Sequence, residues 1–276
     1  NHAQGWPYYS EHLILATPDN GAAIALYAAC KATLKVADGQ EITLHEQTNY
    51  PFEEKISFTV NTTEDVRFPF YLRIPSWCDQ PELAINGKQK EIDPIPGKYI
   101  YIDRTWTDGD KVELNLPMKL SIHTWQVNKN SVSVNYGPLT LSLKINEEYI
   151  QKDSRSTAIY DSRWQEGADA TQWPSYEIFP KSPWNYALVL DSKVPLKNFK
   201  VIRKEWPSDN FPFTVSNVPL EVKAIGKQIP SWTLDKYGLC SELPETNAPK
   251  GDREEITLIP MGAARLRVSA FPNTYE

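Results

Sequence analysis

Hydrophobic and polar residues alternate with a period of two along much of the chain, most clearly in residues 66–118. Within residues 67–74 the side chains separate into two sets. The apolar set is Phe68, Phe70, Leu72 and Ile74, and the alternating set contains Arg67, Tyr71 and Arg73. The same alternation returns around residues 99–104 and 112–116. A period of two is typical of β-strands with one buried face. Asn86-Gly87 between two such runs predicts a two-residue hairpin turn, because both residues tolerate positive φ. The region is therefore predicted to form antiparallel β-structure.

The fold class that this pattern predicts is all-β, with two tandem antiparallel β-sandwiches. About eight strands between residues 21 and 120 are enough for a first sandwich. Residues 121–276 are expected to form the second. Residues 1–20 precede both and contain a segment that could be the last turn or two of a helix. Helix content should be low, because the 22 prolines are spread throughout and each would break a helix interior.

The second sandwich is less regular than the first. Residues 150–185 contain three tryptophans and several prolines without a clear period, so we expect an irregular insertion there, with room for a short helix. The strands expected beyond it are Ala187–Leu190, Phe199–Arg203, Phe213–Val215, Leu220–Ile225, Glu255–Ile259 and Ala264–Ser269.

Composition and charge exclude several classes of function. The net charge of −6 and the lack of clustered Lys and Arg argue against nucleic-acid binding, which needs phosphate neutralisation. The longest apolar run, Ala22–Cys30, is too short to span a bilayer. The three isolated cysteines, Cys30, Cys78 and Cys240, match neither a disulfide framework nor a zinc site. We predict no metal site in this chain.

No catalytic residue is predicted from the paired acids or the histidines. A glycosidase holds two carboxyl groups across a sugar, whereas neighbouring residues on a strand point to opposite faces. The pairs Glu53-Glu54, Glu147-Glu148 and Glu254-Glu255 are therefore interpreted as solvated surface charge. The four histidines show no metal-ligand spacing.

The nine tryptophans are the best candidates for contact with a ligand, because sugars stack their C–H faces on aromatic rings. Trp77 and Trp106 lie at the ends of strand patterns and are predicted to be core residues. Trp164, Trp173 and Trp232 lie in irregular segments and are the candidates for carbohydrate stacking at the surface.

A series of motifs in residues 66–118 resembles one group of enzymes. The motifs are Arg73-Ile74-Pro75-x-Trp77, Asn86-Gly87, Pro96-Gly97-x-Tyr99, Arg104-x-Trp106, Gly109-Asp110 and Leu116-Pro117-Met118. Further stretches at 16–30, 48–60, 134–143, 184–191 and 256–272 extend the likeness. Together they resemble the region that follows the catalytic barrel in the β-L-arabinofuranosidase-like glycoside hydrolases of family 127 and its relatives.

The resemblance implies an (α/α)6 catalytic barrel, with a cysteine nucleophile beside a zinc ion, followed by β-sandwiches. Residues 1–20 would then be a remnant of the barrel. Asn1 and His2 resemble residues beside the family's cysteine run and would lie near the substrate in the full-length enzyme. The cysteine pair itself does not occur here, so zinc is implied only for the barrel, and this chain alone is expected to be inactive.

The implied function is a non-catalytic portion of a periplasmic or secreted hydrolase that degrades L-arabinose-containing or related plant glycans. Its expected partners are the catalytic barrel of the same polypeptide, a carbohydrate substrate and a possible second copy of itself. The alternative is a stand-alone carbohydrate-binding module that uses exposed aromatic residues. Because function does not follow from a sandwich fold, the two possibilities must be separated by experiment.

Overall fold

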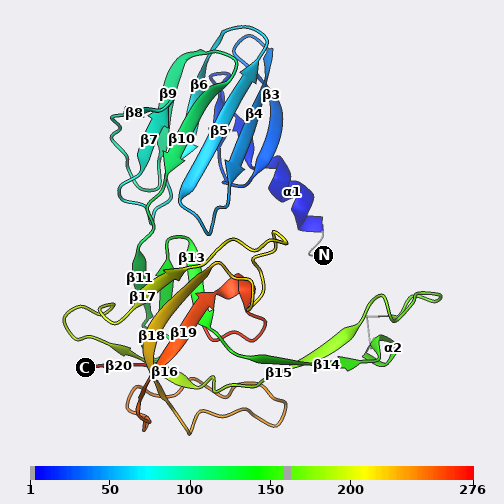
Figure 1. Cartoon of the computed structure of the whole chain (residues 1–276), viewed down its shortest axis with the longest axis vertical. Helices are drawn as coiled ribbons and strands as arrows, with labels where there is room; N and C mark the ends of the chain where they lie inside the picture. The colour runs from blue at the N-terminus through cyan, green and yellow to red at the C-terminus, as the bar shows by residue number, and fades with distance from the viewer. Residues whose placement is uncertain (1–3, 158–162) are drawn as a thin grey trace. The chain divides into compact units, whose positions relative to one another are not determined.

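The computed structural model describes residues 4–157 and 163–276 (Figure 1). It divides into two compact units, Asn1–Lys119 and Leu120–Glu276, called here the N-terminal and C-terminal units. The structure is 45% strand and 6% helix, so the predicted all-β class and low helix content are confirmed. None of the described residues belongs to a helix long and apolar enough to cross a membrane.

The N-terminal unit is a two-layer sandwich preceded by the short helix α1 (Gly5–Glu11). One sheet has the order β1 (Ile14–Ala16), β2 (Ala22–Ile24), β6 (Val66–Arg73) and β9 (Tyr99–Trp106). The other has the order β3 (Cys30–Val36), β4 (Gln40–Thr48), β5 (Lys55–Thr62), β10 (Asp110–Asn115), β7 (Glu82–Ile85) and β8 (Lys88–Lys90). Pairing is antiparallel except between β2 and β6, which are parallel. Non-consecutive neighbours in both sheets show that strands distant in sequence build each layer.

The core of this unit follows the predicted alternation. Phe68, Phe70, Leu72 and Ile74 are all buried, and they meet side chains such as Phe58 from the facing sheet. Trp106 is fully buried and donates its indole N–H to the carbonyl oxygen of Phe68 at 3.0 Å, which satisfies its polar atom. Its predicted core location is confirmed. Trp77 is only half-buried and packs against the core from its margin.

The Asn86-Gly87 turn is confirmed, with φ of 52° and 72° between β7 and β8. Two successive positive φ values are those of the hairpin turn whose twist matches that of the strands. The turn is tied to the neighbouring strand, because the Asn86 amide donates to Asp110 at 2.7 Å. The hairpin is thereby fixed against β10.

The C-terminal unit contains one eight-stranded sheet around its own core. The order is β11 (Leu120–Trp125), β12 (Ser131–Tyr136), β13 (Leu139–Leu143), β19 (Arg253–Pro260), β18 (Leu220–Gln228), β16 (Tyr186–Leu190) and β20 (Asn273–Tyr275), with β17 (Lys200–Arg203) on β18. A 3-10 turn, η2 (Met261–Ala263), follows β19. Alternate residues of β12, β13, β16, β18 and β19 converge on one hydrophobic cluster.

Two of the expected strands in this unit are wrong. Residues 213–215 and 264–269 have no strand structure. The second segment still lies along β13, where the Leu143 N–H donates to the Val268 carbonyl oxygen and the Ser142 hydroxyl contacts the same residue. Its apolar positions therefore mark burial beside a sheet rather than membership of one.

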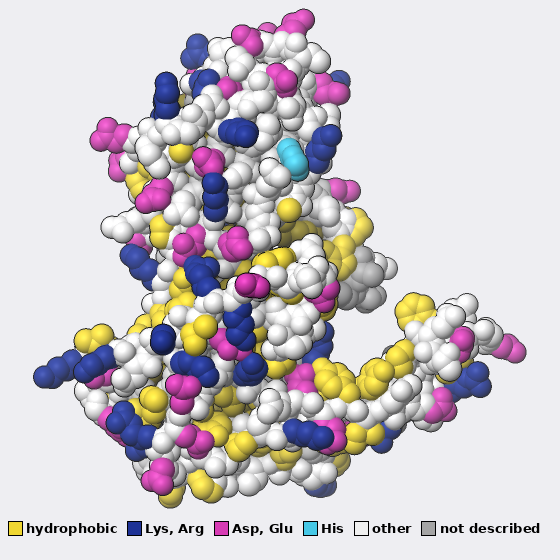
Figure 2. Space-filling model, in the orientation of Figure 1, with side chains coloured by type: hydrophobic (Ala, Val, Ile, Leu, Met, Phe, Trp, Pro, Cys, Tyr) yellow, Lys and Arg dark blue, Asp and Glu magenta, His cyan; other side chains and the backbone are white. Residues whose placement is uncertain are grey.

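The insertion expected near residues 150–185 proves to be more regular than its sequence indicates. It contains a two-stranded ribbon, β14 (Glu147–Lys152) and β15 (Ser175–Pro180), and the short helix α2 (Ser154–Thr157). Figure 1 shows the ribbon projecting from the sheet, and Figure 2 shows hydrophobic side chains exposed along it. Because neither face of the ribbon is buried, its strands have no hydrophobic alternation to reveal them.

Candidate functional site

The predicted site residues have different environments. Asn1 and His2 lie outside the described residues. Trp173 is 69% exposed and is available to a ligand, whereas Trp164 is half-buried, and its indole nitrogen has no hydrogen-bond partner among the described residues. The surface location expected for Trp232 is wrong. This side chain is 3% exposed, packs edge-on against Trp184 at 5.0 Å and donates to the Ser241 carbonyl oxygen.

The most unusual titratable group is Glu46 on β4. It is 1% exposed and faces the core in phase with Ile42 and Leu44. Its carboxylate accepts a hydrogen bond from the Ala28 N–H at 3.0 Å, and the Cys30 thiol lies 3.9 Å from its second oxygen. Burial raises the pKa of Glu46 to about 8, against the smaller opposing effect of these two hydrogen bonds.

A protonated carboxyl group could act as a general acid, but the position of Glu46 argues against this role. A substrate must come within hydrogen-bond distance of its acid, and a side chain that is 1% exposed offers no such approach. Burial also raises the pKa of the Cys30 thiol to about 11, so the thiolate that a nucleophile needs is disfavoured. The two residues form a partly buried polar contact within the sandwich.

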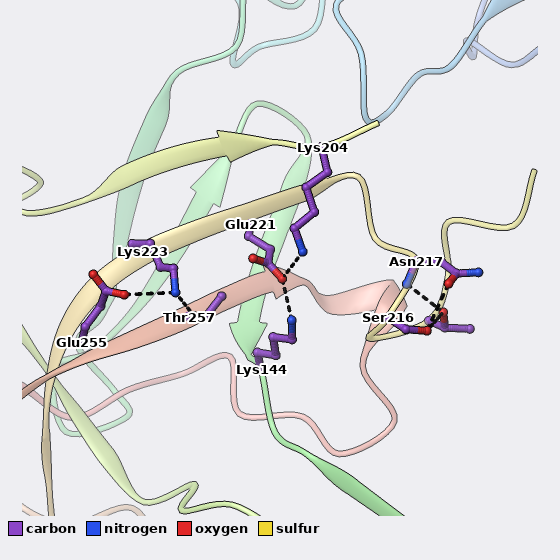
Figure 3. Close-up of polar contacts among 9 residues, drawn as sticks. Lys144, Lys204, Ser216, Asn217, Glu221, Lys223, Glu255 and Thr257 are labelled. Atoms are coloured by element: carbon purple, nitrogen blue, oxygen red, sulfur yellow. Dashed lines mark hydrogen bonds and ion pairs between the residues drawn. The ribbon is translucent and has the colours of Figure 1, made fainter. Parts of the chain in front are cut away.

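A second charged cluster lies on the C-terminal unit (Figure 3). The Glu221 carboxylate on β18 is buried and forms ion pairs with Lys144 and Lys204, each with an N–O distance of 2.6 Å. Burial opposes ionisation, but the hydrogen bonds from the two lysines outweigh it and lower the pKa of Glu221. The carboxylate is thus held ionised between two ammonium groups, an arrangement that suits an ion-pair network better than proton transfer.

The described residues do not fit a metal ion. Among residues 4–157 and 163–276, no group of three or more His, Cys, Asp or Glu side chains is arranged to hold one. Within the same residues all three cysteines are free, with Cys78 buried and Cys240 exposed. The zinc that the resemblance implies is therefore not assigned to any of these residues.

An aromatic surface on the N-terminal unit was not identified from the sequence. Tyr71 on β6 lies directly opposite Tyr101 on β9, with their ring centroids 5.1 Å apart, and Tyr99 lies 6.5 Å from Tyr71. Tyr99 and Tyr101 are 45% and 56% exposed. The alternation in residues 99–104 places both tyrosines outward, which is the signal that could have indicated them. The nearby Leu15 and Asp19 come from distant parts of the sequence, so the pattern could not show the surface as a whole.

Comparison with known proteins identifies the class of domain. Residues 21–118 match the model of the middle domain of the GH127 β-L-arabinofuranosidases, which is the span of the N-terminal sandwich. Solved structures of this class share the fold of the whole chain. A GH127 β-L-arabinofuranosidase from Geobacillus stearothermophilus T6 matches with a TM-score of 0.64 and 20% identity over 99% of this chain. The chain resembles a domain of the GH127 family.

Two further structures extend this likeness. A protein described as a glycoside hydrolase matches over 95% of this chain with a TM-score of 0.60, and another GH127 β-arabinofuranosidase over 94% with a TM-score of 0.57, both at 20% identity. This chain spans only 36–37% of the length of the three solved proteins. No curated protein matches the chain significantly.

Proposed function

We propose that this chain is a non-catalytic β-sandwich portion of a GH127-like glycoside hydrolase that acts on L-arabinose-containing or related plant glycans. The observation that carries the proposal is the match of residues 21–118 to the GH127 middle domain. The fold match supports it, because it covers nearly all of this chain but little more than a third of each neighbour. In this proposal the catalytic barrel, with its zinc, belongs to another part of the same polypeptide.

The contacts of the paired acids support a non-catalytic role. Glu147 accepts hydrogen bonds from the backbone N–H groups of Arg265 and Leu266 and from the Tyr149 hydroxyl, which fixes the base of the ribbon. Glu254 accepts from the Tyr186 hydroxyl at 3.2 Å. These contacts give the two carboxylates a structural role, and adjacent acids on a strand point to opposite faces rather than across a sugar bond.

Helix α1 is the segment that we assign to contact with the catalytic barrel. It has no buried residue, and Trp6, Tyr8 and Tyr9 on it are 57%, 67% and 39% exposed. A contiguous apolar surface of this kind is typical of a contact with another protein surface. Packing of this helix against the barrel would brace the two domains together.

An activity assay tests the proposal. The 276-residue chain and a longer polypeptide that includes the barrel would be incubated with aryl β-L-arabinofuranoside and other aryl glycosides, with zinc and a thiol reductant. The Geobacillus stearothermophilus enzyme serves as the positive control. We expect turnover by the longer polypeptide and none above buffer by the chain alone. Turnover by the isolated chain would place the active site within it and contradict the proposal.

A matched pair of variants tests the bracing role. Trp6→Ala with Tyr8→Ala should lower the melting temperature of the longer polypeptide but leave that of the 276-residue chain unchanged, since neither side chain is buried in the chain. Tyr237→Ala, which removes an equally exposed ring from the C-terminal unit, should change neither. Equal effects of the paired substitution in both proteins would refute a contact between α1 and the barrel.

A further inference from the structure

We propose that the outer face of the β2–β6–β9 sheet binds an oligosaccharide, with Tyr71, Tyr99 and Tyr101 as its stacking platform. The inference concerns direct binding by the N-terminal unit and does not depend on whether that unit braces a catalytic barrel. It rests on three features of this face, which are tyrosine rings in mutual contact, a hollow beside the rings and fixed polar groups at the rim.

A hollow lies beside the tyrosines on this face. It has a volume of about 570 Å³ and is lined by Leu15, Asp19, Ala23, Tyr71 and Tyr99, among others. Ala23 pairs with Tyr71 across the parallel β2–β6 contact and with Leu15 on β1, so a small side chain lies between two large ones. This difference in size leaves room beside the face of the Tyr71 ring.

A second hollow of about 650 Å³ lies at the edge of the sandwich, between β9 and the β7–β8 hairpin. Its lining includes core residues such as Leu83, Ile85 and Ile100, so it is separate from the outer face of the sheet. The hollow beside Tyr71 and Tyr99 has a volume within the range of small-molecule sites, about 300–1,000 Å³. Tyr101 contacts Tyr71 and extends the aromatic surface beyond this hollow.

The rim provides hydrogen-bonding groups that are already held in place. The Asp19 carboxylate accepts the Tyr71 hydroxyl at 2.6 Å and the Thr17 hydroxyl. The Asp103 carboxylate accepts two hydrogen bonds from the Arg67 guanidinium, at 3.2 and 2.9 Å. These hydrogen bonds lower the pKa of both carboxyl groups, so both are ionised and retain lone pairs that can accept further hydroxyl groups.

This combination favours a carbohydrate over a protein partner. The C–H groups on one side of a sugar ring carry partial positive charge and stack on the negative face of an aromatic ring, while its hydroxyl groups point outward to polar neighbours. The tyrosine hydroxyl, the carboxylates and the guanidinium are ordered before any ligand arrives, which reduces the entropic cost of binding. Because three rings in contact extend along this face, the surface suits a ligand of several sugar units better than a single sugar.

Titration of the 276-residue chain with L-arabinose, arabinohexaose and xylohexaose, followed by NMR and calorimetry, tests the inference. We expect a hexasaccharide to bind at least tenfold more tightly than the monosaccharide, with shifts centred on residues of β6 and β9. Tyr101→Ala should weaken hexasaccharide binding by about tenfold, or about 1.4 kcal/mol, because the stacked ring face is lost. Tyr101→Phe should retain most of the affinity, because it keeps the ring face.

Controls separate this result from general sugar adhesion and from unfolding. Tyr237→Ala removes a 74% exposed tyrosine from the C-terminal unit and should leave binding unchanged, and circular dichroism verifies that each variant is folded. Equal loss of binding in Tyr237→Ala and Tyr101→Ala would overturn the proposal. The proposal would also be overturned if none of the sugars bound. This includes a result in which the tyrosine substitutions change only the self-association of the chain. Neither result bears on the activity assay of the longer polypeptide.

Discussion

At the scale of single residues, Glu46 makes the stability of the N-terminal unit dependent on pH. Its pKa rises from 4.5 to about 8 on folding, so between these values the folded chain binds more protons than the unfolded chain. Stability should therefore fall as pH rises through this range. Glu46→Gln stays neutral while retaining an oxygen for the Ala28 N–H. We expect this substitution to raise the melting temperature at pH 8. The decrease in melting temperature between pH 5 and pH 8 should become smaller.

The matched control is Glu41→Gln, an exposed position on the same strand. It removes the same formal charge without removing a buried carboxyl, so the decline in melting temperature should persist. If the Glu46→Gln variant and the unsubstituted chain lose stability equally over this pH range, burial of Glu46 does not set the pH dependence.

Single residues also show where sequence reasoning succeeds. The alternation of polar and apolar residues correctly placed the side chains of β6 on their two faces. The position of Trp106 at a strand end correctly indicated the core. The same alternation could not place Trp232, because it lies outside any strand and is covered by Trp184 and Ile229. Whether a loop residue is buried depends on tertiary contacts that have no local period.

At the scale of elements, the hairpin of β7 and β8 depends on its two-residue turn. Gly87 has φ of +72°, and no described atom other than its own neighbours lies within 4 Å of the position of an added Cβ. Gly87→Ala therefore causes conformational strain without a clash, and we expect a loss of roughly 1–2 kcal/mol in the free energy of unfolding. Urea denaturation of the N-terminal unit, residues 1–119, measures this loss.

Gly87→Asn is the conservative comparison, because asparagine adopts positive φ more readily than alanine. It should lose clearly less stability than Gly87→Ala. Equal losses in the two variants would show that the side chain, rather than the backbone conformation, is the cause.

Elements were predictable only where one face is buried. The strands of the first sandwich follow the alternation, and the Asn-Gly turn fixed one hairpin in advance. The β14–β15 ribbon exposes both faces and therefore has no period, although its six rungs are regular. Residues 264–269 show the converse, since their apolar positions are covered without strand pairing.

At the scale of the whole molecule, pairing between segments distant in sequence determines which residues share a surface. Local sequence patterns do not contain this information. The tyrosine surface combines β1 and β2 from the start of the chain with β6 and β9. β2 and β6 pair in parallel, so no hairpin turn in the sequence predicts that they are neighbours. The sequence could therefore indicate that Tyr99 and Tyr101 face outward, but not which residues surround them. The family likeness could be recognised from the sequence because most of its motifs lie within one continuous stretch, residues 66–118.

The two units should fold independently of each other. Each has its own cluster of buried hydrophobic residues, one between residues 22 and 116 and the other between residues 132 and 271. A domain with its own core can fold alone, so fragments 1–119 and 120–276 should each unfold cooperatively in urea. A fragment of residues 1–106 is the control, because it lacks β10, the strand between β5 and β7, and should not fold. Cooperative unfolding of the full chain together with unfolded 1–119 and 120–276 fragments would show that the units stabilise each other.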